Sequence, residues 1–365
     1  MMKIADIISY LESIAPPSLQ ENYDNAGLIT GNMEMEITGA LICLDSTEQI
    51  IDEAINLHCN LVIAHHPVVF NGLKKINGKN YIERTIIKAI KNDIAIYAIH
   101  TNLDNVRDGV NEMIARKLEL LDCKILSPKK GLLKKLVTFV PNANAETLRQ
   151  GLFDAGAGHI GHYDHCSFNL EGTGSFRGDE STNPYVGSKG EEHHEPETRI
   201  EVIYPSHLER AILSALRQNH PYEEIAYDIY LLDNKHQQAG AGLIGKLKHP
   251  MYEFLFLRFV KSTMLASSVR HTAFRDKNVE YVAVCGGSGS FLLPEAIAAG
   301  ADVFITADFK YHQFFDADGR IIIADIGHYE SEQFTIGLIT DLLQKKFPNF
   351  ALHFTKINTN PINYL

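Results

Sequence analysis

The feature that most constrains the fold is a repeated unit in which a short apolar run leads into an amphipathic helix, with histidine or aspartate at the junction. Residues 321–324 form one such run, and residues 325–344 continue it through a polar turn into helical spacing. Comparable runs lie at residues 39–44, 60–64 and 94–99. Strands that alternate with helices in this way predict an α/β domain with a mixed, mostly parallel sheet covered on both faces.

Residues 128–241 follow a different order of elements. Here the apolar periodicity predicts strand, helix, strand, strand, helix and strand, which is the β-α-β-β-α-β order of a ferredoxin-like unit. A polar loop rich in glycine, serine and acidic residues separates the two middle strands at residues 172–197. We therefore expect a discontinuous α/β core domain made of residues 1–127 and 242–365, interrupted by a ferredoxin-like insertion at residues 128–241.

Composition limits the classes of protein to which the chain can belong. Its 365 residues are 45% hydrophobic and 22% charged, which is a globular balance. A formal net charge of -11 argues against a general nucleic-acid surface. No run approaches the roughly 18–20 apolar residues that span a bilayer, and the N-terminus lacks a signal-peptide pattern. Five scattered cysteines without a CxxC pair indicate reduced thiols, so we expect a cytoplasmic protein that does not enter a membrane.

Histidines and carboxylates collect at the predicted carboxyl ends of the strands, which is where α/β sheets place their sites. His328 and Glu332 are four residues apart, so on a helix both side chains share one face. Alone, such a pair is more often a hydrogen-bonded surface pair than a metal site. Its repetition at several strand ends indicates a metal centre, and the polar residues at those ends are Asp45, His65, His66, His100, Asp104, Asp308, His312, Asp325, His328 and Glu332.

The residue types restrict the metal. Imidazole and carboxylate without thiolate suit zinc as the first candidate, with iron, manganese, cobalt or nickel as alternatives. The number of candidate histidine and carboxylate ligands exceeds the three that one catalytic ion needs, which favours two divalent ions ~3.5–4 Å apart with a bridging carboxylate. Glu332 and Asp104 are both open as the bridge. His100, Asp308 and His312 are expected either to support the ligands from behind or to face the substrate, and His100 and His312 are the candidate catalytic proton carriers. The predicted ligands are His65, His66, Asp104, His328 and Glu332.

Several motifs in order resemble the NIF-three-like family of dinuclear metal-centre proteins, often labelled GTP cyclohydrolase type-two homologues. The motifs are YDNAGL near residue 23, AHHP at 64–67, HTNLD at 100–104, CGGSG at 285–289 and GHYESE at 327–332. The middle segment looks like the PII/CutA-like insertion of longer bacterial members, through GHIGHYDHCSF at 158–168, GTGSFRG at 172–178 and HPYEEIAYD at 220–228.

The resemblance implies the same five metal ligands and a toroidal homohexamer whose metal sites face an internal cavity. Two positions depart from the family pattern. Tyr23 stands where members usually have tryptophan, and Ala307 stands where they usually have glycine. Neither position is a proposed ligand, although alanine tolerates fewer backbone angles than glycine.

Two functions remain open at this stage. One is a metal-dependent hydrolase acting on an unassigned small molecule, such as a nucleotide or another phosphate-bearing or heterocyclic compound. The other is a non-catalytic, metal-binding regulatory or chaperone-like oligomer with a ligand-sensing insertion. Three stretches have alternatives of their own: residues 286–290 as a tight turn or an anion-binding loop, residues 191–195 as a solvated loop or a metal site, and residues 220–224 as structural or part of a regulatory ligand pocket.

Overall fold

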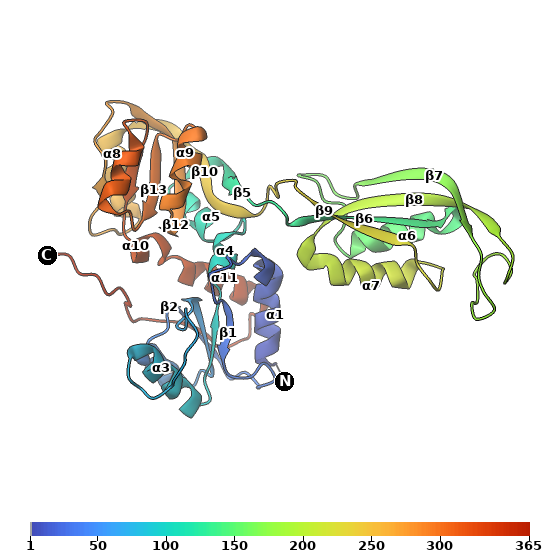
Figure 1. Ribbon diagram of the computed structural model, residues 1–365. Coiled ribbons are helices and arrows are strands. Elements are labelled where there is room, and N and C mark those ends of the chain that lie inside the picture. The colour runs from blue at the N-terminus through green and yellow to red at the C-terminus, as the bar shows by residue number, and fades with distance from the viewer. Residues whose placement is uncertain (1) are drawn as a thin grey trace. The chain divides into compact units, whose positions relative to one another are not determined.

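The computed structural model describes residues 2–365 and divides the chain into two compact units (Figure 1). The larger unit joins the chain up to Pro128 with Gln238–Leu365. The smaller unit is the intervening segment Lys129–Gln237. The larger unit therefore forms only when two segments on either side of the smaller one fold together.

The first sheet of the larger unit is built on buried parallel strands. β2 (Ala40–Asp45), β3 (Leu61–His66) and β4 (Ala95–Ala98) pair in parallel, and nearly all of their residues are buried. Burial on both faces explains why they read as continuous apolar runs in the sequence. β1 (Gly27–Thr30) pairs antiparallel with β4, and β15 (Leu352–Phe354) pairs parallel with β2, so they form the two edges.

Helices with capped N-termini pack against this sheet. α2 (Glu48–Asn56) begins at Thr47, whose hydroxyl accepts the backbone N–H of Ile50, and α3 (Tyr81–Lys91) begins at Asn80, which caps its first turn in the same way. α1 (Ile4–Ile14) lies beside α11 (Thr335–Lys346), where the Tyr10 hydroxyl donates to the Leu342 carbonyl. The apolar core between the sheet and the helices α2 and α3 includes Leu41, Ile50, Ile51, Val62, Ile86, Ala89 and Ile96.

The second sheet of the larger unit has a parallel centre and antiparallel flanks. Its order is β11-β14-β13-β12-β10-β5, in which β12, β13 and β14 pair in parallel and the remaining pairs are antiparallel. The strands are β5 (Leu120–Pro128), β10 (Gly240–Tyr252), β11 (Arg270–His271), β12 (Asn278–Ser288), β13 (Val303–Ala307) and β14 (Ile322–Asp325).

Two longer helices, α5 and α8, and two short ones, α9 and α10, accompany this sheet. α5 (Val110–Lys117) contacts β5, β10 and β12, and α8 (Glu253–Thr263) packs on β10 and β12. α9 (Leu293–Ala298) supplies Leu293 and Ala296 to a core shared with β12 and β13. α10 (His328–Glu332) directly follows β14 after a short turn.

The larger unit differs from the sequence-based expectation in two ways. Its strands form two sheets instead of the single sheet that was expected. Residues 240–252 and 120–128 are long strands that the sequence pattern did not indicate. β10 is rich in glycine and lysine, so its extended form depends on hydrogen bonds to β5 and β12 on its two sides instead of on its own alternation.

The smaller unit has one antiparallel sheet, and both of its helices lie against the same face of it (Figure 1). Along the sheet the order is β7-β8-β6-β9. The core between sheet and helices includes Leu136, Val140, Leu148, Leu152, Ile200, Val202, Tyr204, Ile212 and Leu216. The elements in chain order are β6 (Leu133–Pro141), α6 (Ala145–Asp154), β7 (Ser167–Phe176), β8 (His193–Pro205), α7 (Glu209–Asn219) and β9 (Tyr227–Leu232).

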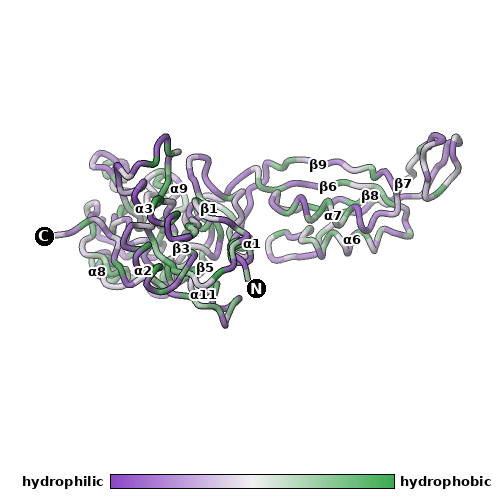
Figure 2. Tube along the Cα trace, turned by 90° about the horizontal axis from the view of Figure 1, so that it is seen from below, coloured by the Kyte–Doolittle hydropathy of each residue, from purple (hydrophilic) through white to green (hydrophobic). Residues whose placement is uncertain are grey.

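The middle hairpin of the smaller unit extends further than the sequence suggested. The ladder between β7 and β8 continues through Gly172–Glu197 to the Phe176–His193 pair, within the stretch that was expected to be loop. The chain between these strands is mostly polar, as the purple and white tube at that end shows (Figure 2). Backbone pairing with a neighbouring strand therefore overrides the low strand propensity of glycine and glutamate here. Throughout residues 2–365, no helix is both long and apolar enough to cross a bilayer.

Candidate metal centre

The first half of the candidate site comes from the carboxyl ends of the first sheet. The parallel strands β2 and β3 end with Asp45 and His66 in register, and His65 precedes His66. After β4, the short helix α4 (Thr101–Asp104) carries Asp104 toward the same edge. Because parallel strands end at one edge, side chains far apart in the sequence meet there.

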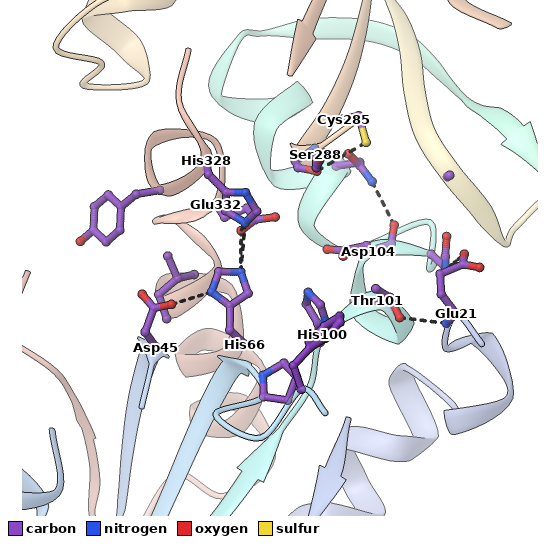
Figure 3. A pocket seen from close by; sticks show the side chains of 18 of the residues that line it. Glu21, Asp45, His66, His100, Thr101, Asp104, Cys285, Ser288, His328 and Glu332 are labelled. Atoms are coloured by element: carbon purple, nitrogen blue, oxygen red, sulfur yellow. Dashed lines mark hydrogen bonds and ion pairs between the residues drawn. The ribbon is translucent and has the colours of Figure 1, made fainter. Parts of the chain in front are cut away.

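The second half comes from α10, which follows the carboxyl end of β14 in the second sheet. His328 and Glu332 lie at its two ends, and their side chains approach to 3.1 Å between Nε2 and Oε2. Figure 3 shows these two side chains facing His66, which enters from the strand below. The two sheets thus present their carboxyl edges to a common space inside the larger unit.

Glu332 lies at the centre of the cluster because its two carboxylate oxygens face different partners. Oε2 lies 2.9 Å from Nε2 of His66 and 3.1 Å from Nε2 of His328. Oε1 lies 3.8 Å from Nε2 of His65, which in turn lies 3.6 Å from Oδ1 of Asp104. Two groups of potential ligand atoms therefore share Glu332: His66 and His328 on one side, and His65 and Asp104 on the other.

Each histidine of the cluster is held by its Nδ1 atom, which turns Nε2 toward the site. His66 Nδ1 is 2.8 Å from Asp45, and His328 Nδ1 is 2.6 Å from Asp308. His65 donates to the Ile99 carbonyl at 2.8 Å, and His100 Nδ1 lies 2.7 Å from Asp24. A carboxylate or carbonyl behind each imidazole is the arrangement that orients histidine ligands in metalloproteins.

Two buried polar atoms in the cluster have no hydrogen-bond partner. They are Nε2 of His65, a residue with no exposed surface, and Oδ1 of Asp104. A buried polar atom left unpaired costs roughly 1–3 kcal/mol, so such atoms in a native structure call for a ligand, an ion or water. Their positions, with the histidine and carboxylate donor set around them, fit a divalent cation.

The electrostatics of the cluster favour a cation as well. Burial together with the neighbouring Glu332 charge raises the pKa of Asp104 to about 7. Burial by itself lowers the pKa of His66, but hydrogen bonds to Asp45 and Glu332 outweigh it and raise that pKa to about 9. For His328, Glu332 and Asp308 likewise overcome the effect of burial and raise the pKa to about 11. The same negative charge that holds protons on these imidazoles attracts a metal ion.

Glycine near the end of β12 allows Glu332 to occupy this position. Gly287 has a φ of 61°, and a Cβ atom at this residue would collide with Oε1 of Glu332. The N–H of Gly287 donates to the Ser331 hydroxyl at 2.9 Å, and the N–H of Gly286 donates to Asn111 at 3.0 Å. Gly286, Gly287 and Ser288 belong to β12, where the register with β13 shifts after Val284, so this part of the CGGSG stretch is an irregular strand end and not a tight turn. Side chains of the protein occupy the N–H groups of Gly286 and Gly287, so these two groups are not free for an anion.

The cluster opens into a cavity of ≈ 480 Å³ within the larger unit. Beyond the histidines and carboxylates, its wall includes the aromatic side chains of Tyr23, Phe70 and Phe291. Tyr23, at the position where tryptophan was expected, packs beside Phe70 with ring centroids 6.3 Å apart. Among the described residues that line it, none is lysine or arginine. The cavity therefore combines an acidic, histidine-rich floor with a partly apolar wall.

The structure brings the five predicted ligands together, and it places the other predicted residues as follows. His100 lines the cavity and joins His65 and His66 in one potential ligand group. His312 is exposed on the 3₁₀ helix Tyr311–Ala317 and is absent from the described lining of the cavity. Asp325 faces away from the cluster, because it pairs with Arg270 and accepts the N–H of Phe309.

Sequence reasoning did not assign a role to Asp24, which is half of the His100 pair. Asp24 accepts hydrogen bonds from Thr101 and from Nδ1 of His100. Burial by itself raises the pKa of Asp24, but these contacts outweigh burial and lower that pKa to about 2. The YDNAGL motif contained Asp24, but nothing local connected residue 24 to residue 100.

Ala307 fits without strain, because it lies buried in β13 while Asp308 carries the positive φ of 59°. Aspartate tolerates this left-handed region better than most residues.

The fold and the cluster define an α/β protein with a candidate histidine and carboxylate metal centre between two sheets. The chain belongs to the Duf34/NIF3 family (NGG1p interacting factor 3), which residues 2–361 match. This confirms the resemblance seen in the motifs.

Close relatives cover nearly the whole chain. A Bacillus subtilis protein named GTP cyclohydrolase 1 type 2 homolog is 38% identical over 364 residues, covering 98% of each chain. The crystal structure of a Bacillus cereus protein related to NIF3 has 39% identity and a TM-score of 0.88, and the match covers 100% of this chain and 99% of that one. The crystal structure of Staphylococcus aureus protein SA1388 has 29% identity and a TM-score of 0.78, with the same coverage.

Proposed function

We propose that the protein binds two divalent metal ions bridged by Glu332 and hydrolyses a small molecule in the adjoining cavity. The observation that carries this proposal is the division of the cluster into two ligand groups that share the Glu332 carboxylate. His65 and Asp104 would hold one ion, and His66 and His328 the other. Zinc is the first candidate for this donor set, ahead of iron, manganese, cobalt and nickel.

When bound, such ions lower the pKa of a coordinated water and polarise a substrate oxygen. The chain's own residues prepare the site for this chemistry. Asp45 and Asp308 fix the tautomers of His66 and His328. His100 donates its Nδ1–H to Asp24, which leaves its Nε2 free to take or give a proton inside the cavity. His312 as a second proton carrier remains a prediction.

The lining of the cavity restricts the substrate. Tyr23, Phe70 and Phe291 suit a flat heterocyclic group. The relatives named GTP cyclohydrolase 1 type 2 homolog make a nucleotide one candidate. Because no described lining residue is lysine or arginine, a phosphate-bearing substrate would depend on the metal ions for charge neutralisation. A substrate with few phosphate groups therefore fits better than a triphosphate.

A second candidate function is a metal-binding regulatory or chaperone-like oligomer without turnover, in which the inserted unit senses a ligand. The separate cavity in the smaller unit favours it. The strand order β7-β8-β6-β9 with both helices on one face supports a ferredoxin-like, PII/CutA-like insertion. A cytoplasmic homohexamer is part of both proposals.

Metal content and turnover separate these functions. The full chain is stripped, reloaded separately with zinc, iron, manganese or cobalt, and assayed against a panel of nucleotides, phosphoesters and cyclic amides. Two ions per chain with turnover of one substrate class supports the hydrolase, and His328→Ala should lose metal and activity together. Two ions with no turnover under any metal favours the regulatory protein. Full metal retention by His328→Ala, measured by elemental analysis, contradicts the assignment of the site.

A further inference from the structure

The smaller unit contains a cavity that the proposed hydrolase activity does not use and whose ligand the regulatory alternative leaves unspecified. Its volume is ≈ 290 Å³, and every residue that lines it lies within Lys129–Gln237. The wall is formed by the end of β7, the chain that follows it, Glu197 on β8 and the loop between α7 and β9. Two motifs singled out in the sequence, GTGSFRG at 172–178 and HPYEEIAYD at 220–228, provide most of this wall.

A buried carboxylate faces this cavity. Glu197 on β8 is only 7% exposed, and its Oε1 accepts a hydrogen bond from the Tyr222 hydroxyl at 2.8 Å. Glu195 and Glu201 on the same strand pair with His193 and with Lys135 and Arg199. No ion pair among the described residues includes Glu197, although Arg177 also lines the cavity. A carboxylate offers about four acceptor positions, so one hydrogen bond leaves most of its capacity unused.

The backbone is shaped to admit this carboxylate. A Cβ atom at residue 174 would collide with the Glu197 carboxylate, so only glycine on the neighbouring strand leaves room for it. Burying a charge without an opposite charge is costly in a protein interior. Tyr222 offsets part of that cost through its hydroxyl, and a positively charged ligand would offset the rest.

Aromatic side chains line the same cavity as this carboxylate. The ring of Tyr222 lies 6.0 Å from that of Phe176 and 6.3 Å from that of Tyr185, measured between centroids. Tyr222 is held in place because its backbone N–H donates to Nδ1 of His220, whose Nε2 donates to the Phe139 carbonyl at 2.8 Å. Aromatic faces around a carboxylate attract organic cations through the ring quadrupole as well as through charge.

We propose that this cavity binds a small organic cation, an alkyl- or trimethyl-ammonium group that sits against Glu197 between the three rings. Glu223 and Glu224 on the rim add negative charge, and Arg177 is the single basic residue in the described lining. A bare metal ion fits less well, because none of the potential ligand groups among the described residues lies in this unit. The volume suits a ligand of a few heavy atoms beyond the charged group.

The test uses titration calorimetry on the full chain with matched probes. Choline chloride carries the trimethylammonium group, 3,3-dimethylbutan-1-ol is its uncharged isostere, and n-butylammonium chloride is the primary amine. We expect choline or butylammonium to bind at least about tenfold more tightly than the neutral alcohol. Binding of both ammonium probes no tighter than that of the alcohol, or no binding of either ammonium probe at millimolar concentration, overturns the proposal.

Three variants locate the site. Glu197→Gln keeps the side-chain shape and should weaken ammonium binding at least about tenfold, while the thermal midpoint holds or rises because a buried charge is gone. Glu171→Gln on β7 is the matched control, since Glu171 is exposed and outside the cavity lining, and it should bind the probes as the unaltered chain does. Tyr185→Ala, in an exposed loop where folding is not at risk, should weaken ammonium binding severalfold. Unchanged binding by Glu197→Gln contradicts the proposal whatever the other variants do.

Discussion

Oε2 of Glu332 lies 2.9 Å from Nε2 of His66, although the two residues are 266 positions apart in the chain. Glu332 belongs to α10 beside the second sheet, and His66 ends β3 in the first. Because the whole smaller unit lies between them in sequence, this contact requires the outer segments to fold together. The contact lies within the ligand group that also contains His328, and Glu332 belongs as well to the group formed with His65 and Asp104.

Glu332 should be needed for both metal ions. Glu332→Gln keeps the volume of the side chain and removes its charge, so the metal content should fall from about two ions to below one per chain. Glu330→Gln is the control, since Glu330 lies buried in the same helix but belongs to none of the ligand groups. Elemental analysis of both purified variants measures the ratio, and a Glu332→Gln protein that keeps both ions would disprove the bridge.

Gly287→Ala should remove metal without altering any ligand. The new Cβ atom would push Oε1 of Glu332 out of place, and the φ of 61° adds strain of about 1 kcal/mol. Gly300→Ala provides the same strain alone, because Gly300 has a φ of 76° and nothing lies within 4 Å of its Cβ position. Thermal unfolding should show a similar small loss for both variants, whereas metal analysis should show a loss only for Gly287→Ala. Equal metal content in the two variants would mean that Gly287 does not position Glu332.

Asp308 should raise metal affinity although it is not expected to bind metal itself. Its carboxylate holds Nδ1 of His328 at 2.6 Å, so Asp308→Asn should weaken metal binding about 10–100-fold. Asp318→Asn tests the same chemical change at another positive-φ aspartate, which caps the 3₁₀ helix Tyr311–Ala317 away from the cavity. Competition with a chromophoric chelator measures both affinities. If the two variants bind metal equally well, the contact between Asp308 and His328 has no role in affinity.

The smaller unit should lose stability in mild acid. Burial lowers the pKa of His220 below its usual value of about 6.5. The unfolded chain then binds more protons than the folded one, so stability is full above pH ~6.5 and falls as the pH drops below it, by up to ~1.4 kcal/mol per pH unit for this one buried histidine. Hydrogen exchange of the β6 and β8 amides between pH 7.5 and 5.5 measures this loss. His220→Gln should flatten the slope, and an unchanged slope would exclude His220 as a source.

Much of the architecture could be predicted from the local pattern of apolar and capping residues in the sequence. The buried strands that carry His65 and His66 read as apolar runs because a parallel strand covered on both faces has few polar residues. The helix N-termini at Thr47 and Asn80 could be located in the same way, from residues that cap the first turn. Those patterns hold over short spans, so local propensity and periodicity suffice to find them.

The strands that the sequence did not predict are those stabilised mainly by hydrogen bonds to adjacent strands. β10 and the outer parts of β7 and β8 contain glycine, lysine and glutamate, and they are extended because other strands pair with them along their length. The division of the core strands into two sheets has the same origin, since β10 and β5 attach beside β12 from distant parts of the chain.

The sequence by itself determined which residues could be ligands, because histidine and carboxylate at successive strand ends are chemically suited to a metal wherever they meet. It left open whether Glu332 or Asp104 lies between the two groups, and it could not pair Asp24 with His100. Only the tertiary structure decided these points. It did so because two sheet edges, brought together by segments on either side of an inserted unit, place the oxygens of Glu332 toward His65 on one side and His66 on the other.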